Sequence, residues 1–235
     1  GGLEFKDTTY RYPEADLDTL RGINLKIKEG EKVAILGRNG SGKSTLMKLA
    51  SGLFKASDGL VMYDGVDIKQ LHTEDLSSSV GIVLQDVQLF SGTVRENITM
   101  GRENISQEDL VQAGKLSGLD EFISKIPGGY DLLLSDGGKG LSGGQRQAIA
   151  LARSIVHKPS HFILDEPTSA MDMNAENLFI NQVGSILKES TMLIVTHRMP
   201  LLNLVDRIIV MNEGQIVEDG PKDEIIQKLN QPRQS

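Results

Sequence analysis

The sequence lacks cysteine and has no long apolar run. Without cysteine there is neither a disulfide framework nor a thiolate metal site, a composition that suits a reducing compartment. The longest unbroken apolar stretch is residues 148–152, whereas an α-helix needs about 20 apolar residues to cross a bilayer. No signal-peptide pattern opens the chain either. The residues given therefore exclude a disulfide-stapled fold and a membrane-spanning helix.

The bulk composition is that of an ordinary globular domain. Hydrophobic residues make up 39% of the 235 residues and charged residues 24%, so the chain can bury one large core or a core with a sub-domain. The formal net charge of −7 disfavours a nucleic-acid partner, which would require a basic face. The chain begins Gly1-Gly2 rather than with methionine, from which we expect a fragment of a longer polypeptide.

Residues 37–45 match the phosphate-binding pattern G-x-x-x-x-G-K-[ST] without a mismatch. An apolar, β-branched stretch at 32–36 predicts a buried strand before the match, and residues 44–50 suit a helix after it. In that context the loop points backbone N–H groups and a helix N-terminus at an anion. Lys43 can reach the β- and γ-phosphates, and the Ser44 hydroxyl can ligate Mg²⁺. A glycine turn that merely caps a helix is the alternative, and the flanking elements disfavour it. The segment is predicted to be a nucleoside triphosphate cradle.

Strands and helices alternate around this loop. Alternating apolar residues at 23–28 and the Asp64-Gly65 turn predict a small antiparallel sheet, whereas the composition after residue 85 is helical. We predict an α/β fold: a P-loop NTPase core with a mostly parallel sheet, an antiparallel β sub-domain and an inserted helical sub-domain. The expected parts are a core of residues 1–85 and 160–235, a helical sub-domain of 86–159, buried core strands at 162–164 and 192–195, a hairpin at 207–218 and a last helix that starts at Gly220-Pro221 and runs through Leu229.

An apolar stretch at 161–164 ends in two adjacent acids, Asp165 and Glu166. Carboxylates at the carboxyl end of a strand in an α/β sheet lie in the ligand crevice, where the phosphate loop also opens. Asp165 would hold Mg²⁺, as the Walker B acid of phosphate-loop enzymes does, and Glu166 would polarise the water that attacks the γ-phosphate. A solvated strand end is the alternative, and the phosphate loop upstream favours the catalytic interpretation.

Residues 141–145 read Leu-Ser-Gly-Gly-Gln and open a second amphipathic helix. Ser142 is a good N-cap, so this glycine-rich helix N-terminus also suits an anion. Because one phosphate cradle is already complete, such a site would need a nucleotide from elsewhere. The alternative is a capped helix whose glycines pack closely against a neighbour, and the residues alone leave both interpretations open.

The combination of segments 37–45, 141–145 and 162–167 resembles the nucleotide-binding domain of an ATP-binding cassette (ABC) transporter. The resemblance covers essentially the whole chain and implies a single ABC ATPase domain at 1–235. It implies a head-to-tail homodimer that closes on two ATP molecules, each held between the phosphate loop of one subunit and the LSGGQ signature of the other. Ser142 and Gly144 would then contact the γ-phosphate across the dimer.

Further residues take roles from this resemblance. Tyr12 resembles the aromatic residue that stacks on adenine, although from the pattern alone it is an ordinary strand tyrosine. Gln85 resembles the glutamine that senses Mg²⁺ and the attacking water, residues 169–172, with Asp172, resemble the loop that crosses the dimer interface, and His197 resembles the switch histidine. From the residue pattern alone, Gln85 is a polar residue at a strand end and His197 is a structural residue. The predicted catalytic residues are Lys43, Gln85, Glu166 and His197; the predicted Mg²⁺ ligands are Ser44, Gln85 and Asp165; the predicted ATP contacts are Tyr12, Gly37, Asn39, Gly40, Ser41, Gly42, Lys43, Ser44, Thr45, Gln85, Ser142, Gly144, Gln145 and Asp172.

The branch of the family is indicated by shorter segments. Residues 89–98 and 127–131 resemble exporter-type domains, and 169–172, 204–207 and 219–223 are more like bacterial type I secretion ATPases, which export proteins and peptides. This implies a transmembrane domain in the same full-length polypeptide, at the cytoplasmic face of the bacterial inner membrane. Membrane-fusion and outer-membrane proteins of a secretion system are further implied partners. Asp136 stands where exporters usually carry glutamate, so the acid is kept on a shorter side chain.

Three rival functions remain. One is a soluble ABC ATPase that acts on nucleic acid or ribosomes, although no sustained heptads separate Lys43 from Leu141 and the chain carries one cassette. The second is an exporter domain for lipid or drug substrates. The third is a regulatory module that binds ATP without hydrolysing it, which the complete catalytic set makes a poor match.

Overall fold

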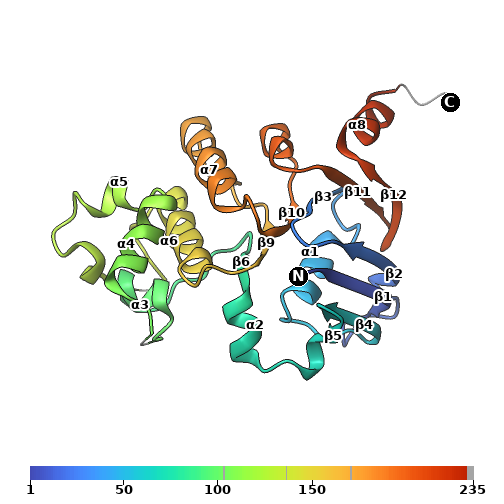
Figure 1. The fold of residues 1–235 in the computed structure, drawn as a ribbon, viewed down its shortest axis with the longest axis horizontal. Helices are drawn as coiled ribbons and strands as arrows, with labels where there is room; N and C mark the ends of the chain where they lie inside the picture. Colours follow the sequence, from blue (N-terminus) through green and yellow to red (C-terminus); the bar gives the residue numbers. More distant parts are fainter. Residues whose placement is uncertain (103, 136, 170, 232–235) are drawn as a thin grey trace.

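Helices α3 (Val94–Thr99), α4 (Gln107–Leu116), α5 (Asp120–Ile123) and α6 (Gly143–Ile155) form a lobe beside the sheets (Figure 1). The computed structural model describes residues 1–102, 104–135, 137–169 and 171–231. Within those ranges, no helix has the length and apolar character needed to traverse a membrane. The predicted α/β fold class is confirmed by this arrangement and by the sheet topology below.

A mostly parallel sheet forms the centre. Its strands lie in the order β12 (Gln215–Pro221), β11 (Arg207–Asn212), β3 (Lys32–Gly37), β10 (Thr191–Val195), β9 (His161–Asp165) and β6 (Val80–Val83). All neighbouring pairs are parallel except β11 with β12. Every residue of β9 and β10 is buried, as expected for parallel strands covered on both faces. The carboxyl ends of β3, β9 and β10 therefore meet at one edge of the sheet.

A second, antiparallel sheet packs against the first through helix α1 (Lys43–Ala50). Its strands lie in the order β2 (Leu20–Ile27), β1 (Leu3–Tyr10), β4 (Asp58–Tyr63) and β5 (Val66–Asp67). In β2, buried Ile23, Leu25 and Ile27 alternate with exposed residues, which is the period of a strand with one solvated face. Met47 of α1 shares a buried cluster with residues of both sheets. The phosphate-loop helix is thus fixed between two sheets.

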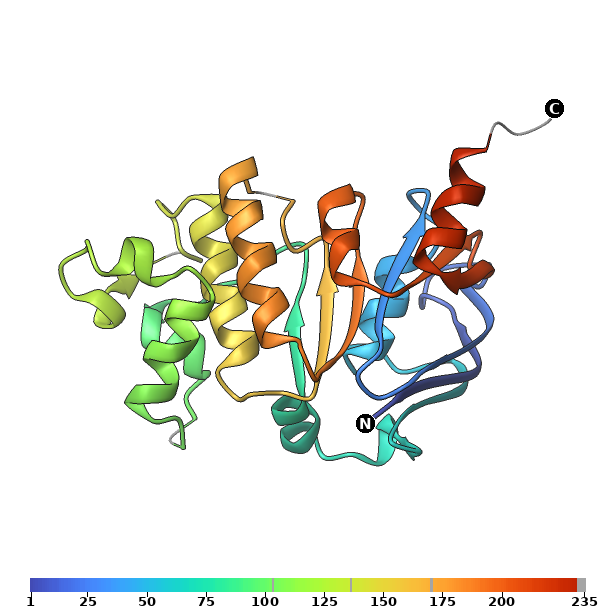
Figure 2. The same cartoon turned by 45° about the horizontal axis from the view of Figure 1, so that its top comes forward.

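The helical lobe continues the hydrophobic core rather than standing apart from it. Its elements are β7 (Gly92–Thr93), α3 (Val94–Thr99), α4 (Gln107–Leu116), α5 (Asp120–Ile123), η2 (Gly129–Asp131), β8 (Leu133–Leu134) and α6 (Gly143–Ile155). Ile149 of α6 belongs to the same buried cluster as Leu164 of β9 and Ile194 of β10. Figures 1 and 2 both show α6 beside α7 (Met173–Ile186). The remaining elements are η1 (Ile68–Gln70), α2 (Thr73–Ser79), η3 (Met199–Leu204) and α8 (Lys222–Asn230).

One local prediction needs correction, and one short strand pair was not predicted. The last helix was expected to start at Gly220-Pro221, but both residues end β12, where Pro221 pairs with Arg207 of β11. Pro221 has an extended ψ of 141° and occupies the N-cap, so α8 begins one residue later. The short pair β7–β8 inside the helical region was not predicted, because two-residue strands carry no readable alternation. The sub-domain boundaries at residues 86 and 159 stay predictions.

Candidate active site

The phosphate loop leaves β3 and enters α1 through glycines that other residues could not replace. Gly37 has φ 153°, and a side chain there would collide with the backbone carbonyl of Met211. Gly42, the N-cap of α1, has φ 101°, and an added Cβ would lie 2.7 Å from Leu20 Cδ2. Since φ values in this range strain any residue with a Cβ, the loop conformation depends on glycine. That conformation opens the N-terminus of α1 towards the edge of the sheet.

Lys43 lies folded over this loop. Its Nζ donates to the carbonyl oxygens of Gly37 at 2.8 Å and Arg38 at 2.9 Å, and the residue is 7% exposed. Burial lowers the pKa of the Lys43 ammonium, and the nearby carboxylates of Glu166 and Asp165 oppose that shift. A cation held by two loop carbonyls can exchange them for the oxygens of an anion in the same loop.

Asp165, the last residue of β9, is 4% exposed. Among the described residues its Oδ1 has no hydrogen-bond partner. Burial raises the pKa of the Asp165 carboxyl, while the Ser44 hydroxyl and the Lys43 ammonium act in the opposite direction. An unsatisfied buried carboxylate oxygen beside a hydroxyl is a hard oxygen donor set of the kind that Mg²⁺ prefers. The residues present therefore fit that ion.

Glu166 adopts a backbone conformation that is unusual for a non-glycine residue. Its φ is 48°, and its N–H donates to the carbonyl of Val195 in β10 at 2.9 Å. His197 Nε2 lies 3.3 Å from Glu166 Oε1, with the glutamate side chain 14% exposed and the histidine 52% exposed. The ends of two adjacent parallel strands thus bring a carboxylate and an imidazole into contact.

One cavity of about 530 Å³ collects most of the predicted phosphate and catalytic residues. The predicted residues that line it are Asn39, Gly40, Gly42, Lys43, Ser44, Thr45, Gln85, Asp165, Glu166 and His197. Thr19, Ser169 and Val195 line it as well. No role was predicted for Thr19, because it precedes β2 in a segment without a motif. Gly37 and Ser41 belong to the loop but not to the lining, and the buried Ser41 hydroxyl has no partner among the described residues.

Tyr12 lies outside the lining of this cavity. Its hydroxyl is 3.2 Å from Thr45 Oγ1, which fixes it to the start of α1. Its ring meets Tyr10 and Phe54 edge-on, with centroid distances of 5.1 Å and 5.7 Å. The tyrosine is therefore half-buried in an aromatic cluster next to the phosphate loop, and adenine stacking stays a prediction.

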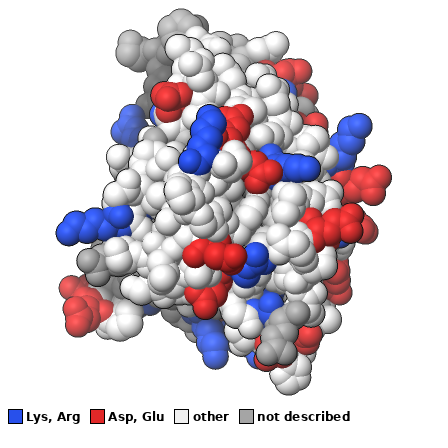
Figure 3. Space-filling model, turned by 90° about the vertical axis from the view of Figure 1, so that its left-hand side faces the viewer, with Lys and Arg blue, Asp and Glu red and all other residues white. Residues whose placement is uncertain are grey.

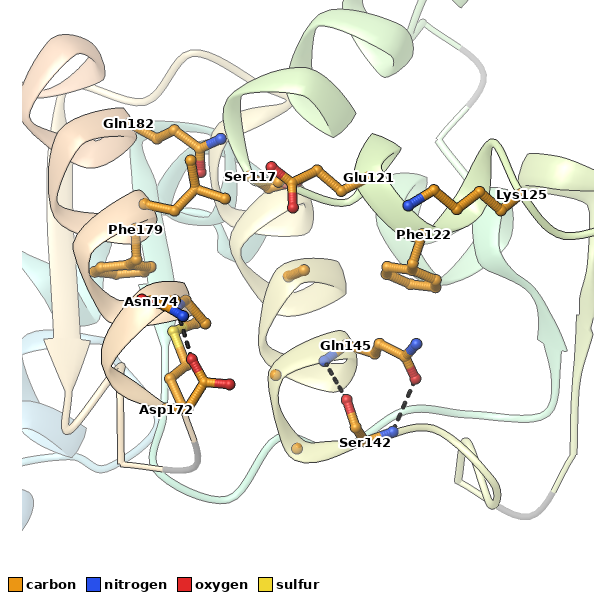
Figure 4. A pocket seen from close by; sticks show the side chains of 17 residues that line it. Ser117, Glu121, Phe122, Lys125, Ser142, Gln145, Asp172, Asn174, Phe179 and Gln182 are labelled. Atoms are coloured by element: carbon orange, nitrogen blue, oxygen red, sulfur yellow. Dashed lines mark hydrogen bonds between the residues drawn. The ribbon is translucent and has the colours of Figure 1, made fainter.

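The signature residues line a different cavity. Ser142, Gly144, Gln145 and Asp172 border a space of about 690 Å³ between α6 and α7 (Figure 4). Gln145 N–H donates to Ser142 Oγ at 3.2 Å and Ser142 N–H donates to Gln145 Oε1 at 2.9 Å, which makes a capping box. Asp172 caps α7 by accepting from the Ala175 N–H at 2.9 Å. The linings of the two cavities share no residue.

Two predicted features involve residues that the structure does not describe. Asp136, the departure from the exporter pattern, lies outside the described residues, as does residue 170 of the predicted interface loop. The structure gives the positions of the site residues. The roles assigned to them stay predictions.

The sequence model of the ABC transporter family matches residues 20–169. The chain belongs to the ABC transporter family. The predicted ABC-type ATPase domain and the predicted fold are confirmed by that membership. A bacterial Atm1-family ABC exporter with ATP bound superposes on this ABC domain with a TM-score of 0.89 and 30% identity, covering 97% of this chain and 40% of the other.

Two curated relatives of this ABC domain carry names that refer to secretion or translocation. The cyclolysin secretion/processing ATP-binding protein CyaB of Bordetella pertussis is 40% identical over 226 residues, which are 96% of this chain. The leukotoxin translocation ATP-binding protein LktB of Mannheimia glucosida is 40% identical over 230 residues, or 98% of this chain. The chain spans 32% of the length of each relative. The predicted similarity to type I secretion ATPases is thereby confirmed.

Proposed function

We propose that this ABC domain binds ATP with Mg²⁺, hydrolyses it and powers an exporter. The observation that carries the proposal is the single cavity in which Lys43, Gln85, Asp165, Glu166 and His197 meet. It combines a cation for phosphate oxygens, a buried carboxylate for a metal ion and a carboxylate–imidazole pair for the attacking water. Phosphoryl transfer needs little more than positioning and charge stabilisation, and these groups supply both.

Each group has a separable task. Lys43 exchanges the carbonyls of Gly37 and Arg38 for the β- and γ-phosphate oxygens, next to the backbone N–H groups of the loop. Glu166 orients the water and accepts its proton. His197 Nε2, which lies 3.3 Å from Glu166 Oε1, holds that carboxylate and contacts the γ-phosphate.

Ser44 and Asp165 would hold Mg²⁺, with Gln85 completing the set at the end of β6. The unpartnered Oδ1 of buried Asp165 supports this assignment. When bound, the ion neutralises charge on the phosphate oxygens. Gln85 is exposed, lies two residues after β6 and lines the cavity, so it can also orient the water.

A second copy of the chain would complete the site. Ser142, Gly144, Gln145 and Asp172 line a cavity of their own, away from the phosphate loop of their own chain. In a head-to-tail homodimer they would face the ATP of the partner subunit, with the α6 N-terminus directed at the γ-phosphate. Tyr12, beside Thr45, would stack on adenine.

The export substrate is proposed to be a protein or peptide of type I secretion. Support comes from the 40% identity to relatives named for cyclolysin secretion and leukotoxin translocation. The chain spans 32% of the length of each relative, which leaves room in a longer polypeptide for the implied transmembrane domain that would deliver the cargo. The domain would then lie at the cytoplasmic face of the bacterial inner membrane, with membrane-fusion and outer-membrane proteins as further partners.

An exporter of lipid or drug substrates is the second candidate, because the 30% identity to the Atm1-family exporter supports an exporter role without indicating what is exported. A nucleic-acid partner has less support. The net charge is −7, and on the helical face in Figure 3 lysine and arginine side chains are interspersed with aspartate and glutamate. Binding to a phosphate backbone would favour a basic surface instead.

The test is Mg-ATP turnover of this chain as a function of its concentration, with Glu166→Gln alongside. The variant keeps the shape of the carboxylate but cannot accept a proton, so turnover should fall by about 10²–10⁴-fold while ATP binding persists. Chelation of Mg²⁺ should abolish turnover in the unaltered chain. Turnover near that of the unaltered chain in Glu166→Gln would remove Glu166 from the role.

A further inference from the structure

Helix α7 buries a carboxylate that none of the roles above uses. Glu176 lies in the first turn of α7, and its side chain is 6% exposed. The neighbouring buried residues of that helix face are Phe179 and Val183. Burying an ionised carboxylate among such residues is costly unless the charge is paired and hydrogen-bonded. The Glu176 carboxylate therefore needs hydrogen-bond donors or a cation close to it.

Those partners come from two other segments. Glu176 Oε1 accepts from the Thr168 hydroxyl at 2.7 Å and lies 3.1 Å from Arg198 Nη1. Thr168 is 1% exposed, so its hydroxyl is also sequestered from solvent. Arg198 Nη2 donates to the carbonyl of Met171 at 3.4 Å. One guanidinium thus contacts the buried carboxylate and the backbone just before α7.

The segments joined in this way are those that carry the active-site groups. Arg198 directly follows His197, and Thr168 follows Glu166 by two residues. Met171 directly precedes Asp172, which lines the second cavity. The Arg198–Glu176 pair therefore links the ends of β9 and β10, where the Glu166–His197 contact lies, to the loop that enters α7.

We propose that Arg198 and Glu176 are positioning residues for ATP hydrolysis, an inference that rests on the proposed function. The pair holds His197 against Glu166 and fixes the Met171–Asp172 backbone at the rim of the second cavity. Neither residue lines the phosphate cavity, so ATP affinity does not depend on them. Their loss misplaces the reacting groups and lowers kcat while KM stays within about threefold of the unaltered chain.

Stability and positioning can be separated by three variants of the full chain. Arg198→Met leaves Glu176 charged, buried and unpaired, so both Tm and kcat should fall. Arg198→Met combined with Glu176→Gln removes the unpaired charge and keeps an acceptor for the Thr168 hydroxyl. The Tm of this double variant should therefore return to within a few degrees of the Tm of the unaltered chain. The contact to the Met171 carbonyl is still missing in that double variant, so kcat should stay about 10–10²-fold low. Lys228→Met, which breaks the exposed pair with Glu218 at 2.7 Å, should change neither quantity.

Each possible outcome either supports or overturns the positioning role of the pair. A double variant that recovers kcat together with Tm makes the pair structural and overturns the proposal. So does a double variant whose Tm stays as low as that of Arg198→Met, or normal kcat in every variant. An unaltered chain that shows no turnover at any concentration refutes the proposed function itself and the positioning role with it. Turnover in the unaltered chain with no effect of the pair refutes positioning alone.

Discussion

Asp165 and Glu166 are adjacent in the chain, yet both line the phosphate cavity. Successive residues of a strand point to opposite faces, so a straight continuation of β9 would separate the two carboxylates. The positive φ of Glu166, held by its hydrogen bond to Val195, interrupts that alternation. Such a conformation is costly for a non-glycine residue and persists where the surroundings enforce it. The strained backbone therefore allows the proposed metal ligand and the proposed base to come from neighbouring positions.

At the residue scale, His161 should make the stability of the domain depend on pH. It is 3% exposed, stacks edge-on against Tyr63 and has no partner at Nε2 among the described residues. Burial lowers the pKa of the His161 imidazole from its ordinary value of 6.5. The unfolded chain therefore binds a proton first as pH falls below about 6.5, and the free energy of unfolding decreases until the folded-state pKa is reached. Tm measured between pH 7.5 and pH 5 should fall.

A variant without this imidazole tests the assignment. In His161→Leu the fall in Tm between pH 7.5 and pH 5 should be smaller, by a few degrees, than in the unaltered chain. His72→Gln, at an exposed position, should leave the pH dependence unchanged. Parallel Tm curves for His161→Leu and the unaltered chain would assign the pH dependence to other groups.

At the scale of elements, two helices in the described part of the chain begin with a capping box, and the two differ in their surroundings. Thr93 and Glu96 exchange hydrogen bonds at the start of α3, as Ser142 and Gln145 do at the start of α6. Replacing either N-cap by alanine should lower the free energy of unfolding by about 1 kcal/mol. Only the α6 cap borders a cavity proposed to face ATP, so Ser142→Ala alone should also lower turnover, by about 10–10²-fold.

Thermal unfolding and turnover of Ser142→Ala and Thr93→Ala, measured side by side, check this prediction. Thr93→Ala serves as the matched control, because it removes the same kind of cap from a helix outside the proposed contact. Equal turnover in the two variants would mean that the signature serine acts only as a helix cap.

The elements that could be predicted are those whose signal is local. The glycine spacing of residues 37–45 predicts the conformation of the phosphate loop, and the acids at the end of β9 follow a clearly apolar strand. Helix α7 was missed, because Glu176 interrupts its apolar stripe. The contact of Glu176 with Arg198 joins segments that are distant in sequence, so only the folded chain reveals it. Local pattern thus predicted the phosphate loop and the two acids, the roles of Gln85 and His197 came from the family resemblance, and the supporting contacts needed tertiary structure.

At the scale of the whole molecule, the phosphate cavity and the signature cavity are separate within one chain. Lys43 and Glu166 line the first, and Ser142 and Asp172 line the second. One ATP could contact both cavities only if a second copy of the chain were present, and ATP would then stabilise the dimer by binding more tightly where both surfaces are present. Hydrolysis of the bound ATP would separate the two copies. Association should therefore depend on nucleotide and on the failure to hydrolyse it.

Glu166→Gln should consequently dimerise with Mg-ATP and stay monomeric without it. The variant binds ATP but hydrolyses it so slowly that the two copies do not separate. Light scattering after size exclusion would report twice the mass of the 25.6 kDa chain at concentrations of tens of micromolar (~10⁻⁵ M). Adding Lys43→Ala to this variant removes the phosphate cation and should restore the monomer in Mg-ATP. A Glu166→Gln chain that remains monomeric although it binds ATP would contradict the shared site, since each ATP would then be held by one subunit alone.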